Sequence, residues 1–225
     1  LFFFLIMIPS LLIANEMEFY IGEGEHPFHT MISENEAGMY GGGLYAKGMC
    51  NVYLSGTRIE KNVAVNGAGI FANDGVEIAA ANLFKSSIHA NEASDTGGGL
   101  YFLTKDQTIL RNLLVTYNKA GKHGGGLHNS AAKISIFNAF FGQNEAKSEG
   151  GGIHIDTRTR LEMTDTIIDG NNAIGGGGIS TDDFYGPNYI TSQNTTASHN
   201  RATGTTACGG NVLLKGGLEP LYIFF

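Results

Sequence analysis

The chain has 225 residues, of which 33 are glycine and 2 are cysteine, and its formal net charge at pH 7 is −7. This acidity argues against a nucleic-acid partner, because proteins bind phosphate backbones mainly through lysine and arginine. A charged fraction of 16% beside a hydrophobic fraction of 42% argues against intrinsic disorder, and the clumped glycines exclude a collagen repeat.

The sequence begins with an apolar segment, residues 1–14, that becomes polar at Asn15. A membrane-spanning helix needs about 20 apolar residues, whereas this run is shorter and is interrupted by Pro9. It is typical of the core of a secretory signal peptide, with Ala14 at the cleavage point. The alternatives are a buried first strand and a membrane anchor. We expect no membrane span in the mature domain, an apolar tail at residues 218–225, and truncation of a longer chain at both ends.

One motif recurs seven times: an apolar residue, two variable positions, Asn, one variable position, Ala, and then a glycine-rich cluster. Successive copies are 26 to 29 residues apart, which indicates a repeat protein. Helical repeats of about 33 to 47 residues do not fit, because a glycine cluster in every unit would destabilise a helix. The repeated asparagines are Asn35, Asn62, Asn91, Asn118, Asn144, Asn171 and Asn200.

Apolar residues alternate with a period of two in three short stretches of each unit, as in Val52/Leu54, Thr57/Ile59 and Ile70. This pattern predicts three short strands per unit separated by turns. Stacked units of this kind form parallel sheets around a narrow core. We therefore predict an all-β fold, a single-stranded parallel β-helix solenoid over residues 15–217, with about seven three-strand coils of ~27 residues.

The seven asparagines occupy the same place in successive coils, where neighbouring strands lie about 4.8 Å apart. We expect their amides to stack as a structural ladder, because a buried amide needs hydrogen-bond partners. The glycine clusters permit positive φ angles and close approach between coils. We interpret both features as structural rather than functional.

The combination of apolar-x-x-Asn with Gly-Gly-Gly-Leu/Ile resembles the paired motifs of chlamydial polymorphic outer membrane proteins, and this resemblance covers residues 32–213. Phe141 carries the phenylalanine that most members place at the apolar position, and the other repeats have mostly isoleucine or valine there. The resemblance implies a right-handed, pectin-lyase-like β-helix, secretion, a place on the cell surface or outer membrane, and an adhesin-like role.

The two cysteines, Cys50 and Cys208, belong to the first and last repeats. Six coils at about 4.8 Å separate them by roughly 29 Å, too far for a disulfide, so we predict that they are free or pair outside this sequence. Cysteine and histidine show no zinc-type spacing along the chain. Asn194-Thr195-Thr196 is a glycosylation sequon that is usable only in a eukaryotic secretory route.

A first column of candidate residues follows the apolar residue after each glycine cluster. If that apolar side chain points inward, the next one points outward. Stacked rings there would suit binding to sugar faces, although stabilisation of the sheet is the preferred explanation of such a stack. These ligand-binding candidates are Tyr45, Phe71, Tyr101, His128 and His154.

A second column, two residues further along, places Asp156 and Asp182 on adjacent coils. Carboxylates about 4.8 Å apart repel unless a proton or a cation intervenes, and calcium is the candidate ion. With Asp183 beside them, they form the candidate catalytic group of a polysaccharide lyase, with Arg158 or Arg160 as base, or of a glycoside hydrolase. A solvated turn explains the same residues, and the short signatures of pectin-degrading enzymes are absent.

The preferred hypothesis is a secreted or surface-displayed β-helix that acts without catalysis as an adhesin-like or scaffold surface. Its candidate partners are carbohydrate or a cell-surface protein, and no cofactor other than calcium is expected. The alternatives are a carbohydrate-active β-helix enzyme and a purely structural fragment of a longer repeat array.

Overall fold

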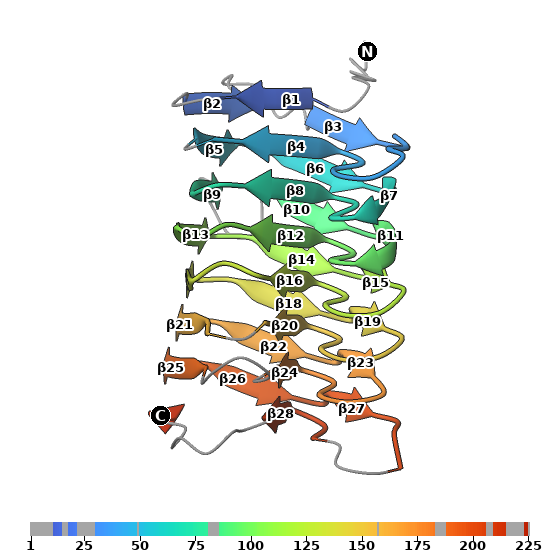
Figure 1. Cartoon of the computed structure of the whole chain (residues 1–225), viewed down its shortest axis with the longest axis vertical. Helices are drawn as coiled ribbons and strands as arrows, with labels where there is room; N and C mark the ends of the chain where they lie inside the picture. Colours follow the sequence, from blue (N-terminus) through green and yellow to red (C-terminus); the bar gives the residue numbers. More distant parts are fainter. Residues whose placement is uncertain are drawn as a thin grey trace.

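The computed structural model confirms the predicted fold class, an all-β, right-handed parallel β-helix. Figure 1 shows the coils stacked one on another along the long axis of the molecule. The structure describes residues 11–14, 18–21, 30–48, 50–80, 86–156, 158–182, 188–205, 209–214 and 223–224. Within these ranges no helix is long and apolar enough to cross a membrane.

Two eight-stranded parallel sheets form two of the walls. Sheet A contains β1 (Leu11–Ala14), β4 (Leu44–Lys47), β8 (Ile70–Asn73), β12 (Leu100–Leu103), β16 (Leu127–Asn129), β20 (Ile153–Ile155), β24 (Ile179–Thr181) and β28 (Val212–Leu214). Sheet B contains β2 (Glu18–Ile21), β5 (Cys50–Leu54), β9 (Val76–Ala80), β13 (Gln107–Arg111), β17 (Lys133–Phe137), β21 (Arg160–Thr164), β25 (Tyr189–Gln193) and β29 (Ile223–Phe224).

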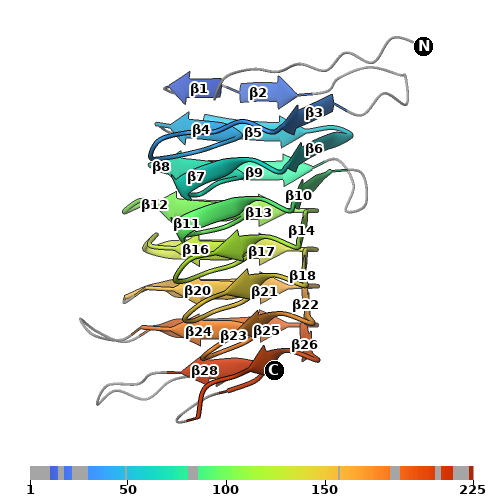
Figure 2. The same cartoon turned by 90° about the vertical axis from the view of Figure 1, so that its right-hand side faces the viewer.

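Two further parallel sheets complete each coil, and Figure 2 views the stack from their side. Sheet C contains β3 (Thr30–Ser33), β6 (Thr57–Glu60), β10 (Ser87–His89), β14 (Leu114–Thr116), β18 (Phe140–Gly142), β22 (Ile167–Asp169) and β26 (Thr196–Ser198). Sheet D contains β7 (Val63–Asn66), β11 (Glu92–Thr96), β15 (Lys119–Ala120), β19 (Glu145–Ala146), β23 (Asn172–Ala173) and β27 (Arg201–Ala202).

The coils differ from the prediction in having four strands rather than three. The residue before each repeated Asn has a positive φ, as at Lys61 (53°) and Tyr117 (57°), and this bend separates sheet C from sheet D. The described residues contain six complete coils rather than seven. After Asn35, the first repeat has only isolated bridges to the next coil, at Glu36 and Tyr40, where later repeats have a sheet D strand.

Aliphatic side chains fill the narrow interior in rows that run along the stack. The residue after each glycine cluster points inward from sheet A, and the apolar residue three positions before each Asn points inward from sheet C, as the alternation predicts. Because every strand adds a side chain to these rows, the core is continuous from coil to coil. The buried sheet A row is Leu44, Ile70, Leu100, Leu127, Ile153 and Ile179.

The glycine clusters form the tight turn that leads from sheet D back to sheet A. Gly124, the first residue of its cluster, has a φ of 65°. A Cβ atom on Gly125 would lie 2.5 Å from the carbonyl oxygens of Glu145 and Gly151. Since non-bonded carbon and oxygen atoms cannot approach so closely, this position excludes every residue with a side chain.

The repeated asparagines lie at the bend between sheets C and D, where they form a row of hydrogen bonds. In the middle of the row, the Nδ2 atom of Asn118 donates to Asn144 Oδ1 at 3.0 Å and to the Ile88 carbonyl at 2.9 Å. The Oδ1 atom of Asn118 accepts from the backbone and side-chain nitrogens of Asn91, both at 3.0 Å. Equivalent side-chain bonds join each neighbouring pair from Asn35 to Asn200, so the buried amides are satisfied.

Two strands lie in segments that the sequence assigned to a leader and an apolar tail. Leu11–Ala14 (β1) pairs in parallel with β4, and Ile223–Phe224 (β29) pairs in parallel with β25. The assignment of residues 1–14 and 218–225 stays a prediction.

Candidate functional site

The first column of candidates lies on the outer side of sheet A, with its members directly paired between coils. We call it the outer column; it comprises Tyr45, Phe71, Tyr101, His128, His154 and Ser180. Its exposure differs from the expectation of an open stack. Phe71 and His154 are buried and His128 is only 5% exposed, while Tyr45 and Tyr101 are partly exposed.

The outer column is covered by another column of residues, which the sequence analysis did not identify. It consists of the residue that immediately precedes each positive-φ glycine or glycine cluster, and we call it the covering column: Tyr40, Asn66, Thr96, His123, Glu149 and Gly175. Because the glycine turn folds the chain back sharply, the covering residue lies beside the outer residue five positions later. His123 thus has its ring centroid 6.4 Å from that of His128, as Tyr40 does from Tyr45.

The first coils place four aromatic rings in these two columns, together with Asn66 and Thr96, which hydrogen-bond to each other. The Phe71 ring centroid lies 4.3 Å from that of Tyr40 and 5.2 Å from those of Tyr45 and Tyr101. The Phe71 and Tyr101 rings meet edge to face, at 88°. Edge-to-face contacts of this kind stabilise a packed aromatic cluster. A sugar could stack on Phe71 only if Tyr40 moved away.

The later coils place three imidazoles and the Glu149 carboxylate in the same two columns. The ring of His154 stacks on His128, with centroids 5.0 Å apart and planes at 20°, and on His123 at 4.6 Å and 25°. Tyr101 forms the border between the two segments, since its ring meets His128 edge to face at 4.7 Å.

Asp156 and Asp182, at the ends of β20 and β24, bring their carboxylates to these imidazoles. His154 Nε2 lies 3.5 Å from Asp156 Oδ1 and 3.7 Å from Asp182 Oδ2, and His128 Nε2 lies 3.4 Å from Asp156 Oδ2. Ser130 donates a hydrogen bond to Asp156. We call His123, His128, His154, Glu149, Asp156 and Asp182 the histidine–carboxylate cluster.

Burial and charge oppose each other in setting the pKa values of this cluster. Burial lowers the pKa of His154, but the carboxylates of Asp156 and Asp182 raise it by more, so its pKa lies above the ordinary histidine value. For His128 burial outweighs the carboxylate, and its pKa is lowered. Burial and the charges of His154 and His128 lower the pKa of His123 to about 4. Burial raises the pKa of Asp156, yet His128, His154 and Ser130 hold it well below its usual range.

The remaining candidates are Arg158, Arg160 and Asp183. Arg158 is exposed in the turn after β20, with a φ of 62°. Arg160 pairs with Glu162 on sheet B, at 2.8 Å from Nε to Oε1. Asp183 lies outside the described residues.

Cys50 is a buried free thiol on β5, and burial raises its pKa. Cys208 lies outside the described residues. Asn194, the sequon residue, is exposed and its Nδ2 donates to Asp165 Oδ1 at 2.5 Å.

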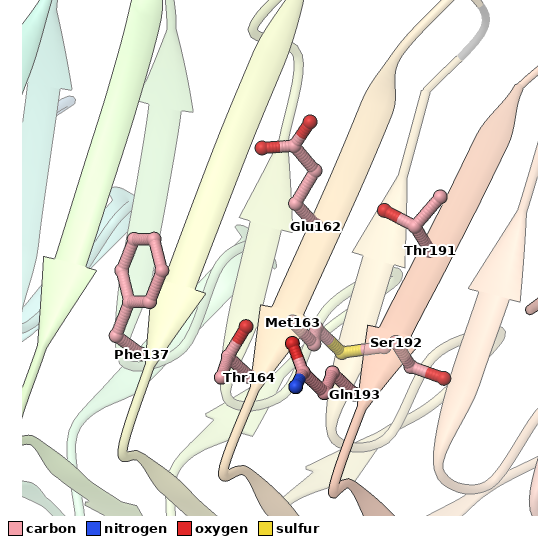
Figure 3. Close-up of a pocket in the computed structure, with 7 residues that line it drawn as sticks. All are labelled: Phe137, Glu162, Met163, Thr164, Thr191, Ser192 and Gln193. Atoms are coloured by element: carbon pink, nitrogen blue, oxygen red, sulfur yellow. The ribbon is translucent and has the colours of Figure 1, made fainter. Parts of the chain in front are cut away.

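A separate pocket of about 220 Å³ lies on sheet B, away from the cluster on sheet A (Figure 3). Its charged residue, Glu162, is paired with Lys133 at 3.0 Å and with Arg160, and it accepts a hydrogen bond from Ser135. Since this carboxylate is already neutralised by two cations, the pocket offers no free acid or base. Its lining comprises Phe137, Glu162, Met163, Thr164, Thr191, Ser192 and Gln193.

The covering column is the part of the site that sequence reasoning missed. Its members precede the glycine clusters at a constant position, so the repeat alignment contains the signal. The alternation rule that located the outer column does not reach them, because the intervening turn interrupts the strand. Because the sequence analysis did not place His123 and Glu149 over it, the outer column was expected to be open to solvent.

The comparisons with known proteins agree with the resemblance seen in the repeats. The chain is 34% identical over 104 residues to the probable outer membrane protein PmpB of Chlamydia trachomatis, covering 45% of this chain and 6% of that protein. It is 33% identical over 118 residues to the probable outer membrane protein pmp20 of Chlamydia pneumoniae, covering 41% of this chain and 7% of that protein.

The chain thus matches less than a tenth of the length of these curated relatives, and their names support a cell-surface or outer-membrane localisation. No family model matches the chain. No solved structure matches it significantly.

Proposed function

We propose that the chain is a surface-displayed β-helix that acts as an adhesin-like or scaffold binding surface and does not catalyse a reaction. The observation that carries this proposal is the continuous stack: parallel strand pairing, the inward aliphatic rows and the Asn row all run from coil to coil. Such a stack forms a stiff rod whose walls present the same positions at a regular spacing. The similarity to outer membrane proteins supports display on a cell surface.

The walls offer chemically distinct faces for a partner. On the outer side of sheet C, Leu114, Phe140 and Ile167 are direct neighbours on adjacent coils and form a partly exposed apolar row. On sheet D, the exposed Glu92, Lys119 and Glu145 are direct neighbours with alternating charge. Rows of this kind give a rod several shallow binding surfaces rather than one deep cleft. The partner that we propose is carbohydrate or a cell-surface protein.

The test is binding of the fluorescently labelled chain to a glycan array and to immobilised collagen, fibronectin and laminin. We expect saturable binding to at least one of these probes. A triple variant with Leu114, Phe140 and Ile167 replaced by Thr, which keeps a β-branched side chain, would report on the sheet C face. The matched variant replaces Glu92 and Glu145 by Gln and Lys119 by Met on sheet D. Binding that survives heat denaturation of the chain, or no saturable binding to any probe, would contradict the proposal.

One observation supports the alternative of a carbohydrate-active enzyme. Asp156 and Asp182 both face His154, which places two carboxylates and an imidazole together at the ends of neighbouring strands. Incubation with polygalacturonate and with a panel of neutral polysaccharides, with and without calcium, would reveal new reducing ends or unsaturated products. Activity that Asp156→Asn and Asp182→Asn both remove would establish the enzyme and overturn the scaffold proposal.

A further inference from the structure

The histidine–carboxylate cluster contains a buried ring nitrogen without a hydrogen-bond partner. The His154 side chain is 1% exposed, and its Nε2 atom makes no hydrogen bond. A buried polar atom without a partner costs about 1–3 kcal/mol, so folded proteins rarely keep one without a reason. This atom lies 3.5 Å from Asp156 Oδ1 and 3.7 Å from Asp182 Oδ2.

These separations are too long for hydrogen bonds but suit two ligands of one metal ion. Hydrogen bonds from an imidazole to a carboxylate are about 2.7–2.9 Å long. In a tetrahedral zinc site, with metal–ligand bonds of about 2.0–2.15 Å, neighbouring donor atoms lie about 3.3–3.5 Å apart. The distances from Asp156 to His154 Nε2 (3.5 Å) and to His128 Nε2 (3.4 Å) agree with that spacing.

We propose that His128, His154 and Asp156 form a binding site for a divalent transition-metal ion of the zinc type. One donor atom from each of the three residues lies within 4.8 Å of the other two. The stacked rings of His128 and His154 would tilt toward each other to bring both Nε2 atoms onto one ion. The ion would replace the hydrogen bond that His128 Nε2 makes with Ser130 Oγ at 3.2 Å. Asp182, near His154, or a water molecule would occupy the fourth position.

A hydrogen bond to Ser180 fixes the His154 ring in the orientation that a metal requires, and the ion would displace the Nε2 proton. The Nδ1 atom of His154 lies 2.7 Å from Ser180 Oγ, a buried hydroxyl that can accept a hydrogen bond from Nδ1–H. With the proton on Nδ1, the lone pair of Nε2 faces the carboxylates. Metal-binding histidines generally donate a hydrogen bond from their second ring nitrogen to such a partner, which fixes the orientation of the ring. Ser180 is thus the positioning residue of the proposed site.

Donor chemistry selects a zinc-type ion over the calcium that the sequence suggested. Calcium takes six to eight oxygen ligands, whereas two of the three donors here are imidazole nitrogens. Zinc, like other late first-row metals, accepts imidazole and carboxylate together. The sequence showed no zinc spacing because its rule concerns ligands close together along the chain, whereas His128 and His154 are 26 residues apart and meet only through the coil stack.

The test is isothermal titration calorimetry of the 225-residue chain with Zn²⁺, and with Ca²⁺ as the comparison ion, after treatment with a chelator. We expect one zinc ion per chain with micromolar or tighter affinity, and calcium binding weaker by at least about 100-fold. Replacement of zinc by Co²⁺ should give the visible absorption of a tetrahedral site. Zinc should also raise the midpoint of thermal unfolding.

Variants distinguish this site from ordinary surface binding. His154→Gln, His128→Gln and Asp156→Asn should each weaken zinc binding by at least about 100-fold, and Ser180→Ala by about tenfold. The matched control is His199→Gln, because exposed His199 also pairs with an aspartate, Asp169, at 2.8 Å. This control should leave zinc affinity unchanged, and circular dichroism would check that each variant keeps its β structure.

Three results would overturn the proposal. The first is no zinc binding, with nuclear magnetic resonance showing both nitrogens of His154 protonated, which would make the cluster a buried ion triad. The second is an equal loss of affinity in His199→Gln. The third is loss of binding in Glu149→Gln but not in Asp156→Asn, which would place the ion at the other triad of donors, His123, Glu149 and His154.

Discussion

The outer and covering columns contain two segments with the same backbone and different chemistry. From Tyr40 to Tyr101 they hold a packed aromatic cluster, and from His123 to His154 they hold three imidazoles and the Glu149 carboxylate, with Asp156 and Asp182 beside them. Strand pairing in sheet A continues without a change of register from one segment to the other. The glycine turn and the strand pairing therefore set where a side chain stands, and the residue type alone decides whether that place is a hydrophobic cluster or an ionisable one.

The largest expected effect tests whether the two segments share one backbone architecture. A Cβ atom on Gly98 or on Gly125 would meet carbonyl oxygens at 2.5 Å or less. Gly98→Ala, beside the aromatic segment, and Gly125→Ala, beside the ionisable one, should each lower the free energy of unfolding by more than about 4 kcal/mol. Guanidinium titration measures this. Gly38→Ala, with no atom within 4 Å of its Cβ, is the control and should change little. Unequal losses at Gly98 and Gly125 would show that the two turns differ.

A second prediction concerns the aromatic segment alone. Phe71 is fully buried between Tyr40, Tyr45 and Tyr101. Phe71→Ala should lower the free energy of unfolding by about 3–5 kcal/mol, because it leaves a cavity among these rings. Phe71→Leu, which fills most of the volume, should cost less than about 1.5 kcal/mol. If Phe71→Ala cost less than 1 kcal/mol, the cluster would not be a stabilising core.

A third prediction concerns a substitution that makes the ionisable segment more like the aromatic one. His154→Phe keeps a ring between His123 and His128 but leaves the buried Ser180 hydroxyl without its partner. In the presence of a chelator we expect a loss of about 1–3 kcal/mol in the free energy of unfolding. Adding Ser180→Ala should recover part of this loss, and a double-mutant cycle measures the coupling. Strictly additive losses would show that the Ser180–His154 hydrogen bond contributes nothing.

The smallest expected effect concerns a histidine outside the cluster. Burial lowers the pKa of His89, and the charge of Arg58 lowers it further. The charge of Glu60 opposes this decrease, and the charge of Lys61 adds to it. The unfolded chain therefore binds this proton more readily than the folded chain does. The stabilisation from neutral His89 is complete above its unfolded pKa of about 6.5 and is lost as the pH falls through the lowered folded value.

The lowered pKa of His89 can be tested by measuring the free energy of unfolding of the parent chain and of His89→Gln at several pH values between 7 and 5. The substitution should make the decline in stability slightly less steep. An identical pH dependence in the two proteins would contradict the lowered pKa.

The β-helix itself was predictable from the sequence because its determinants are local and repeated. Each unit restates the alternation, the buried Asn and the turn glycines, so seven weak signals reinforce one another. The fourth strand escaped prediction because sheet D strands are as short as two residues, as in Lys119–Ala120, and carry too few positions for an alternation to show. The residues with positive φ before the repeated Asn include Lys61, Ala90 and Tyr117, and these residue types do not predict a bend.

The candidate site, like the fold, was predictable from the sequence only in part. The sequence by itself determined which residues share a column, because a residue and its equivalent one repeat later must lie on neighbouring coils. That rule aligned His128 with His154 and Asp156 with Asp182. Only the tertiary structure decided that His123 and Glu149 fold over the outer column, that the histidines are buried, and that the Nε2 atoms face the carboxylates. These properties depend on the path of the turn and on side-chain packing between coils, and neither is encoded in the spacing of residues along the chain.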